Sequence, residues 1–205
     1  HTRDSRFFKI DATTGAIVGE HRVSTGDVIL AHMRLADGEL VTAVSERYQS
    51  VKLGAITIAD WSYRQLPVTS DGLSQYVTGL DVDGDAIYLM GAFGGINGQS
   101  RPFLAAVRKS TGEVLPWRPS PDDDARALRA AGGRVWVGGD FHRIGGQRRR
   151  GLAELDPTTG AALSWNPDVP VGVSSGGLYR DVSNIDVGPD DVLYVTIPGL
   201  SGGLV

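Results

Sequence analysis

A long segment of this chain occurs twice in its sequence. Shifting the 205 residues against themselves by 48 positions places residues 139–167 on residues 91–119. Without a gap, 13 of these 29 positions are identical, where about two would match by chance at ordinary residue frequencies. The chain is therefore built from repeated units, and each unit must bury its apolar surface against its neighbours. The matching pairs include Phe93 with Phe141, Ile96 with Ile144, Gln99 with Gln147, Arg101 with Arg149, and Trp117 with Trp165.

Each repeated unit has the pattern of four short strands. In residues 75–119, apolar residues predict strands over 77–82, 86–90, 103–107 and 114–117, separated by turns rich in Gly and Asp. Residues 125–167 repeat that order. The segment 126–131 has the composition of a helix, but it aligns with the predicted strand at 78–83. We therefore expect a strand there and no long helix in the chain.

Partial copies of the unit occur on both sides of the two clear ones. Residues 6–16 match its second half, residues 27–66 hold a degenerate copy, and residues 182–197 contain only its first two strands. In the degenerate copy, the Asp37-Gly38 pair predicts a hairpin turn.

Four short strands in a unit of about 48 residues are typical of a β-propeller blade. The expected fold class is all-β, a β-propeller with about four blades' worth of four-stranded antiparallel sheets. We expect one propeller region over 1–205. It divides into a half blade (1–20), a degenerate blade (21–70), two blades (71–120 and 121–170) and a half blade (171–205). This is either a segment of a larger ring of six to eight blades, or a four-bladed ring closed by a composite blade from the two ends.

The repeated motif resembles a known family. Gly-x-Phe-x-x-Ile-x-Gly-Gln-x-Arg, followed by Leu-Ala, Thr-Gly and Trp-x-Pro, is similar to the bacterial delta-60-type β-propeller repeats of secreted actinobacterial surface proteins. The resemblance covers residues 75–167 well and residues 6–16 in part. It implies an extracellular or cell-surface propeller, often joined to immunoglobulin-like or sugar-binding modules, and it brings no agreed catalytic residues. The copy before residue 75 and the end at residues 198–201 depart from the motif.

Composition narrows the classes of partner and compartment. The net charge of −4 argues against a surface that tracks nucleic-acid phosphates, and Arg148, Arg149 and Arg150 are expected to be a solvated loop. The chain has no Cys, so it has neither a disulfide framework nor a thiol nucleophile. Its longest apolar run, residues 103–107, is too short for membrane insertion. Because the sequence starts at His1, we expect it to derive from a longer precursor with any signal peptide upstream.

Four polar residues recur in register and are the candidates for ligand binding: Gln99, Arg101, Gln147 and Arg149. They could line a ligand-binding face. Alternatively, each Arg hydrogen-bonds loop carbonyls and each Gln caps a turn. The second interpretation is favoured, because a binding site usually departs from a repeat instead of following it.

Asp81, Asp83 and Asp85 are a weak candidate for a metal site. Three carboxylates within five residues could chelate Ca²⁺, but they lack the spacing and the closing Glu of an EF-hand. They also occupy the position of a hairpin turn in the other copies, so a plain turn is favoured. No other cofactor or metal is indicated, since the four His residues are scattered.

Two classes of function remain. The first is a non-catalytic scaffold or recognition module that binds protein or polysaccharide at the cell surface. The second is a secreted propeller enzyme, a polysaccharide hydrolase or lyase, using carboxylates such as Asp140, Glu154 or Asp181 near a central channel. The regular repeat and the absence of any known catalytic motif favour the first.

Overall fold

The protein is all-β. The computed structural model describes residues 3–25, 28–46, 50–71, 76–167, 172–173 and 179–198, and these form strands and turns with no helix. The strands are β1 (Arg3–Ile10), β2 (Ile17–Thr25), β3 (Val28–Ala36), β4 (Glu39–Glu46), β5 (Ser50–Thr57), β6 (Tyr63–Gln65), β7 (Ser70–Asp71), β8 (Tyr76–Asp83), β9 (Ala86–Ala92), β10 (Gly95–Ile96), β11 (Gln99–Ser100), β12 (Leu104–Arg108), β13 (Ala125–Ala131), β14 (Arg134–Gly139), β15 (Arg143–Ile144), β16 (Gln147–Arg148), β17 (Leu152–Leu155), β18 (Gly172–Val173), β19 (Tyr179–Arg180), β20 (Asn184–Val187) and β21 (Leu193–Thr196).

These strands pair in small antiparallel sheets that follow the repeat. The degenerate copy forms the four-stranded sheet β3-β4-β5-β6, and the two clear copies form the sheets β8-β9-β12 and β13-β14-β17. At the two ends, β1 pairs with β2 and β20 pairs with β21. The strand order predicted from the sequence is confirmed, including β13 over the segment with helical composition.

The predicted fourth strand of the two clear copies is wrong as a full strand. At its place the structure has only single bridges, Val107 with Val114 and Leu155 with Ala162. In the first copy, Pro116 lacks the N–H that a ladder needs. The second copy has Ser164 at this position and stops after the same single bridge. The indole of Trp117 instead lies in the core, fully buried, and donates to the Asp156 carbonyl oxygen at 3.1 Å.

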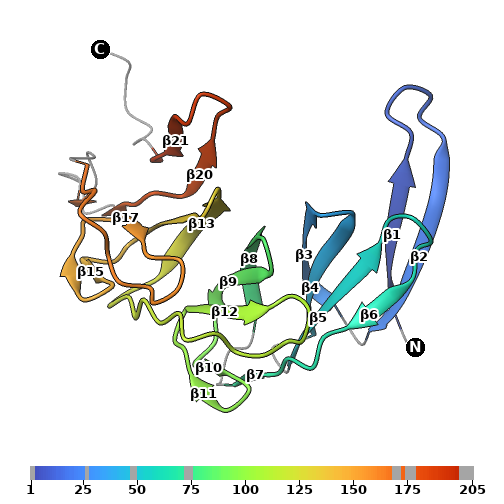
Figure 1. Cartoon of the computed structure of the whole chain (residues 1–205), viewed down its shortest axis with the longest axis horizontal. Helices are drawn as coiled ribbons and strands as arrows, with labels where there is room; N and C mark the ends of the chain where they lie inside the picture. The colour runs from blue at the N-terminus through green and yellow to red at the C-terminus, as the bar shows by residue number, and fades with distance from the viewer. Residues whose placement is uncertain are drawn as a thin grey trace.

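The sheets follow one another along an open arc, shown in Figure 1. The first strand of each sheet, β3, β8, β13 and β20, lies on the concave side, and each contacts the next. We call these four the inner strands. The hairpin β1–β2 lies at one end of the arc and β20–β21 at the other.

Apolar side chains fill the space between successive sheets. Val41 and Leu53 face Ile87 and Leu89 at the first junction. At the second, Tyr88 and Met90 on the opposite face of β9 meet the next sheet in the same manner. The hairpin β1–β2 packs through Phe7 onto the remaining face of β3–β6. Each interior sheet therefore packs both faces against a neighbour, whereas the end pairs β1–β2 and β20–β21 have one neighbour each among the described sheets.

Two glycines at equivalent repeat positions allow this packing. A Cβ on Gly91 would lie 2.1 Å from the Tyr76 carbonyl oxygen, and one on Gly139 would lie 2.2 Å from that of Asp124. In both cases the obstacle is the bulged start of the adjacent inner strand in the same sheet. Gly98 (φ +72°) and Gly146 (φ +79°), also equivalent in the repeat, adopt the left-handed conformation.

Candidate functional site

Arg101 and Arg149 make the same contact in their two copies. The Nη2 of Arg101 donates to the Leu115 carbonyl oxygen at 3.3 Å, and Nη1 donates to the Ser100 carbonyl oxygen at 2.9 Å. Arg149 donates in the same way to the carbonyl oxygens of Leu163 and Arg148. Both guanidinium groups thus tie the loop after the second strand to the segment that follows the third. These are contacts of a clasp within the unit.

The two glutamines lie on the surface beside these clasps. Gln99 accepts a hydrogen bond from Arg101 at 3.1 Å, while Gln147 belongs to the small hairpin β15–β16. Gln99 also borders a shallow pocket of about 270 Å³ with Asp71 and three glycines. The structure brings Gln99 next to Arg101, and it keeps the pair in one copy separate from the pair in the other.

The three carboxylates of the calcium candidate have separate partners. Asp81 is buried and contacts two arginines, Asp83 accepts from the Gly133 amide at 2.6 Å, and Asp85 accepts from the amide and hydroxyl of Ser110, which follows β12. The structure therefore does not bring these three side chains together. In the described part of the chain, no three His, Asp or Glu side chains are placed to hold one metal ion.

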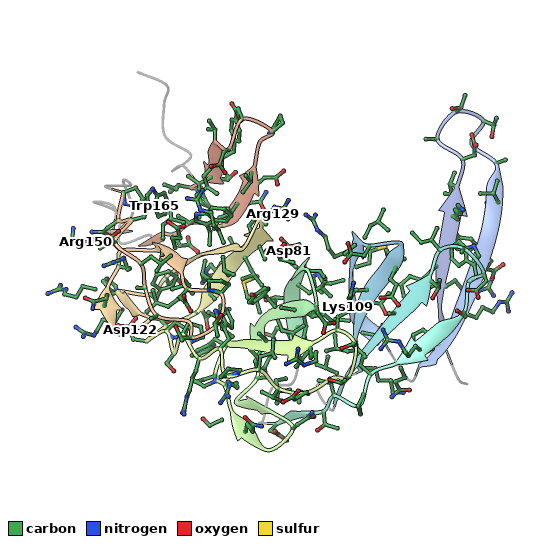
Figure 2. All side chains as sticks on the ribbon, in the orientation of Figure 1. Asp81, Lys109, Asp122, Arg129, Arg150 and Trp165 are labelled. Carbon is green, nitrogen blue, oxygen red and sulfur yellow. The ribbon has the colours of Figure 1, made fainter. Side chains whose placement is uncertain are left out.

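Asp81 instead belongs to a line of alternating charges on the inner strands. Arg34 on β3 contacts Asp81 on β8 at 2.7 Å, and Arg129 on β13 contacts the other carboxylate oxygen of Asp81 at 2.6 Å. Arg129 in turn contacts Asp186 on β20 at 3.2 Å. Figure 2 shows Asp81 and Arg129 pointing toward one another on the concave side. We call these four residues the charge series.

A concavity lined by charged and polar groups lies where the inner strands begin. Its volume is about 370 Å³, and it lies between the starts of β8 and β13. Its lining combines one aromatic ring, hydroxyl groups, a guanidinium and a carboxylate. The lining residues are Tyr76, Thr78, Gly91, Ala92, Asp124, Ala125, Arg126 and Ser183. We call it the inner-strand pocket.

Arg126 connects this pocket to two carboxylates. Its Nη2 lies 2.7 Å from Asp140 Oδ2, and its Nε lies 2.6 Å from Asp181 Oδ2. Asp140 follows β14 and Asp181 precedes β20, so the arginine links two successive sheets. Nearly half of the Arg126 side chain stays exposed at the pocket. The guanidinium can therefore still donate hydrogen bonds to a bound molecule.

Asp140 and Asp181 also interact with each other. Burial raises the pKa of Asp181 above its ordinary value of 3.8, and the charge of Asp140 and a hydrogen bond to its carboxyl add to the rise. Asp140 Oδ1 is buried, and no described residue donates a nitrogen or hydroxyl hydrogen to it. A hydrogen bond between the two carboxyls, with the proton on Asp181, lowers the repulsion between them.

Glu154 lies apart from this pair. It is on β17, the third strand of its sheet, and its carboxylate accepts from Arg134 Nε at 2.8 Å. Arg134 also contacts Asp191 at 3.1 Å and lies over the ring of Trp136. The structure thus brings together Asp140 and Asp181 of the three carboxylates named from the sequence, and it gives Glu154 a separate ion pair.

Arg126 was missed by sequence reasoning, although a signal for it exists. In the preceding copy its position holds Thr78, and the position of Asp140 holds Ala92. Both changes replace an uncharged residue with a charged one beside the same pocket. Departure from the repeat therefore marks Arg126 and its partner Asp140.

Comparison with known proteins finds no matching family model and no matching curated protein. Two solved structures of computationally designed proteins are similar to the chain. The crystal structure of Ika4 aligns with 82% of this chain and 90% of its own, at 15% identity and a TM-score of 0.49. That of Ika8 aligns with 89% of this chain and 48% of its own, at 14% identity and a TM-score of 0.49. The chain thus spans about half the length of Ika8.

The described segments also include no helix with the length and apolar character needed to cross a membrane.

Proposed function

We propose that the chain forms consecutive blades of a β-propeller and serves as a recognition module for a glycan at a bacterial cell surface. The repeat and the arc of small sheets support the propeller interpretation. The extracellular setting rests on the resemblance of the repeated motif to secreted surface proteins. A scaffold with the same fold would hold its partners through its loops.

The inner-strand pocket is the observation that carries the binding proposal. Sugars present many hydroxyl groups that both donate and accept hydrogen bonds, together with apolar C–H faces. Arg126 supplies donors and Asp124 supplies acceptors. The hydroxyls of Thr78 and Ser183 donate to the carbonyl oxygens of Met90 and Thr196, so they offer acceptors to a ligand. The ring of Tyr76 adds an apolar wall. A pocket with a few convergent polar groups is the usual form of a small-ligand site.

The experiment is a depletion assay with the folded chain. Soluble and insoluble polysaccharides are incubated with the protein, and bound protein and new reducing ends are measured in the same tubes. We expect saturable binding without new reducing ends. Arg126→Gln should weaken binding about tenfold or more, since a charged hydrogen bond contributes about 1.5–3 kcal/mol.

Arg148→Gln is the matched control, because Arg148 is an exposed arginine in β16, away from the lining of the inner-strand pocket. Equal loss of binding in both variants, or no loss in either, would contradict the assignment of the pocket. Circular dichroism of both variants checks that the fold is retained.

The second candidate is a propeller hydrolase or lyase, and the Asp140–Asp181 pair is the observation that favours it. Two carboxyls that share a proton can supply an acid and a base. However, glycoside hydrolases of the two-carboxylate type hold these groups about 5–9.5 Å apart, leaving room for the sugar or a water molecule. Hydrogen-bonded carboxyls are closer than that, and Arg126 holds both. Release of product that disappears in Asp140→Asn and Asp181→Asn would establish this second function.

A further inference from the structure

The two ends of the arc expose apolar side chains that are buried at every interior junction. Of nine large apolar residues exposed in the described part of the chain, eight lie in the end elements β1–β3 and β20–β21 or the turns that join their strands. They are Phe8, Ile10, Ile17, Val18, Met33, Leu35, Val192 and Tyr194. The ninth, Leu163, lies in an interior connection.

Tyr194 shows what is missing at the β20–β21 end. In three successive sheets, a member of the charge series pairs across the sheet with an aromatic residue: Asp81 with Tyr88, Arg129 with Trp136, and Asp186 with Tyr194. The first two aromatic side chains are 3% and 2% exposed, with Tyr88 packed against the following sheet. Tyr194 is 58% exposed. Its position predicts a following sheet that would cover it.

At the other end of the arc, apolar side chains of β3 are exposed. Met33 and Leu35 flank Arg34 of the charge series and are 55% and 61% exposed. On the other inner strands, the residues that flank the charged member are buried or half-buried, as Leu80 and Val82 are beside Asp81. What β3 lacks is an inner strand before it, and what β20 lacks is an inner strand after it.

The strands at the two ends of the arc also correspond to different strands of one repeat. The repeat places Phe7 and Ile10 of β1 at the third-strand positions Leu152 and Leu155. The pair β20–β21 supplies a first and a second strand and no third among the described residues. In the complete sheet β13-β14-β17, the second strand pairs with the third, with Trp136 opposite Glu154. The same register places Tyr194 of β21 opposite Lys9 of β1.

Charge adds a further match between the two ends. The charge series starts with Arg34 and finishes with Asp186, whose carboxylate is 73% exposed. If β3 followed β20, Asp186 would meet Arg34 and the alternation of sign would continue. In the structure, β1–β2 and β20–β21 lie at opposite ends of the arc, so the chain's own β1 is not beside its β21 (Figure 1).

We propose that a second copy of this chain completes the arc, with β1 of each copy pairing along β21 of the other. Two copies related by a twofold axis make this joint twice, which closes the assembly. Tyr194 then packs against Met33 and Leu35 of the second copy, and Asp186 meets its Arg34. Each copy contributes four inner strands, so the ring has eight positions of alternating sign, within the usual range of propellers. The proposal rests on the propeller interpretation above and is independent of glycan binding.

The absence of native Cys allows a direct test of the register. The variant Lys9→Cys with Tyr194→Cys places two thiols opposite each other across the proposed joint, where Cα atoms of paired strands lie about 4.5–5.5 Å apart. This distance suits a disulfide. In the control, Arg6→Cys replaces Lys9→Cys, which moves the first thiol about 10 Å along β1. After oxidation we expect a disulfide-linked dimer on a non-reducing gel for the first variant and free thiols for the control.

The other outcomes overturn the proposal. A monomer without free thiols would mean that β21 pairs with β1 of its own chain and closes a smaller ring. Because Tyr194→Cys removes the aromatic contact of the joint, oxidation is carried out at protein concentrations well above the dimer dissociation constant. Under these conditions, free thiols in both variants, or equal amounts of dimer in both, would mean that this joint does not form.

Light scattering tests the same joint without cysteines. We expect the native chain to have twice the mass of one copy, and Tyr194→Ser to raise the dimer dissociation constant about tenfold or more, as loss of a buried aromatic contact does. Leu163→Ser is the control, because Leu163 is exposed but lies away from both ends. A monomeric mass for the native chain at all concentrations would overturn the assembly, while glycan binding at the inner-strand pocket would be unaffected by that result.

Discussion

Asp81 is the residue on which the charge series depends. It is almost fully buried, and it accepts hydrogen bonds from the Arg129 guanidinium and from the amides of Val82 and Ala130, besides its contact with Arg34. Asp81→Asn would leave two arginines without their shared counter-charge. Removing one partner of a buried ion pair costs about 3–5 kcal/mol, and we expect a loss of that size in the free energy of unfolding, measured with urea.

Asp186→Asn is the matched control for this prediction. Asp186 contacts the same Arg129, but its side chain is largely exposed. Exposed ion pairs contribute about 0–1 kcal/mol, so this variant should unfold near the native midpoint when studied as a monomer. Similar losses in both variants would show that burial does not set the energetics of the series.

Substitutions of Arg101 and Arg149 test whether these residues act as a structural clasp or contact a ligand. Lys in place of either Arg keeps the charge but loses the forked donor that reaches two carbonyl oxygens. We expect each substitution to lower the free energy of unfolding by about 1–2 kcal/mol and to leave glycan binding unchanged. Weaker binding with unchanged stability would instead make them ligand-contacting residues.

Asp181 gives the protein a predictable dependence on pH. Because its pKa is raised in the folded state, its protonated form favours folding. Its contribution is fully present below the ordinary value of 3.8 and is lost as pH rises through the raised value. Asp181→Asn keeps a donor toward Asp140 and an acceptor for Arg126. We expect this variant to be more stable than the native chain at pH 7 and to lose this advantage at pH 3 in thermal unfolding. A constant difference across this range would contradict the proton on Asp181.

At the scale of the strand, Gly91 and Gly139 determine how closely β9 and β14 approach the adjacent inner strands. Gly139→Ala would place a Cβ 2.2 Å from a backbone oxygen that cannot rotate away. Gly91→Ala has the same conflict in the preceding sheet. We expect each to lower the free energy of unfolding by about 3 kcal/mol or more, because the overlap forces the backbone to move.

Gly84, a glycine in a turn, is the control position for the substitutions at Gly91 and Gly139. Gly84 has a φ of +55° and open space around it, and Asn tolerates that backbone conformation. Gly84→Asn should therefore change the unfolding midpoint only slightly. If all three variants lost the same stability, loss of glycine and not steric conflict would be the cause.

Most of the strand order could be predicted from the sequence, because identical residues in two copies fix where strands and turns lie. Phe93, Ile96 and Gly98 each returned 48 positions later, and the structure gives both sets the same place. The fourth strand was predicted wrongly in both copies, although only the first has Pro116, so its repeated apolar residues do not show that the ladder stops after one bridge. Sequence repetition indicates that two segments occupy equivalent positions, but it does not show whether either segment forms the hydrogen bonds of a strand ladder.

At the scale of the whole molecule, the hairpin β1–β2 acts as the cover of an end face. Phe7 is buried against Val44 and Ile56 of the following sheet. We expect Phe7→Ala to weaken this docking by about 3 kcal/mol and to speed hydrogen exchange in β1 and β2 while β13 and β14 stay protected. Arg22→Ala, at an exposed position of the same hairpin, should leave exchange unchanged. Uniform acceleration over all strands in Phe7→Ala would mean that the arc unfolds as one unit.

The charge series could not have been found by searching for identical residues. Its members occupy equivalent places on the inner strands, yet each differs in sign from the one before it. Identity between copies, the signal that located the blades, is therefore absent at these positions. The inner-strand pocket has the same property, since Arg126 and Asp140 replace uncharged residues of the preceding copy.

The alternation of charge along the inner strands also restricts which duplications of repeat units a gene for such a chain can accept. Duplication of a single unit would set two inner strands of equal charge side by side, Asp81 beside Asp81 or Arg129 beside Arg129, at a site with little water to screen them. Duplication of two adjacent units would keep every contact between opposite charges. Viable descendants should therefore gain or lose blades in pairs, and a ring with an odd number would need a neutral residue at one inner strand.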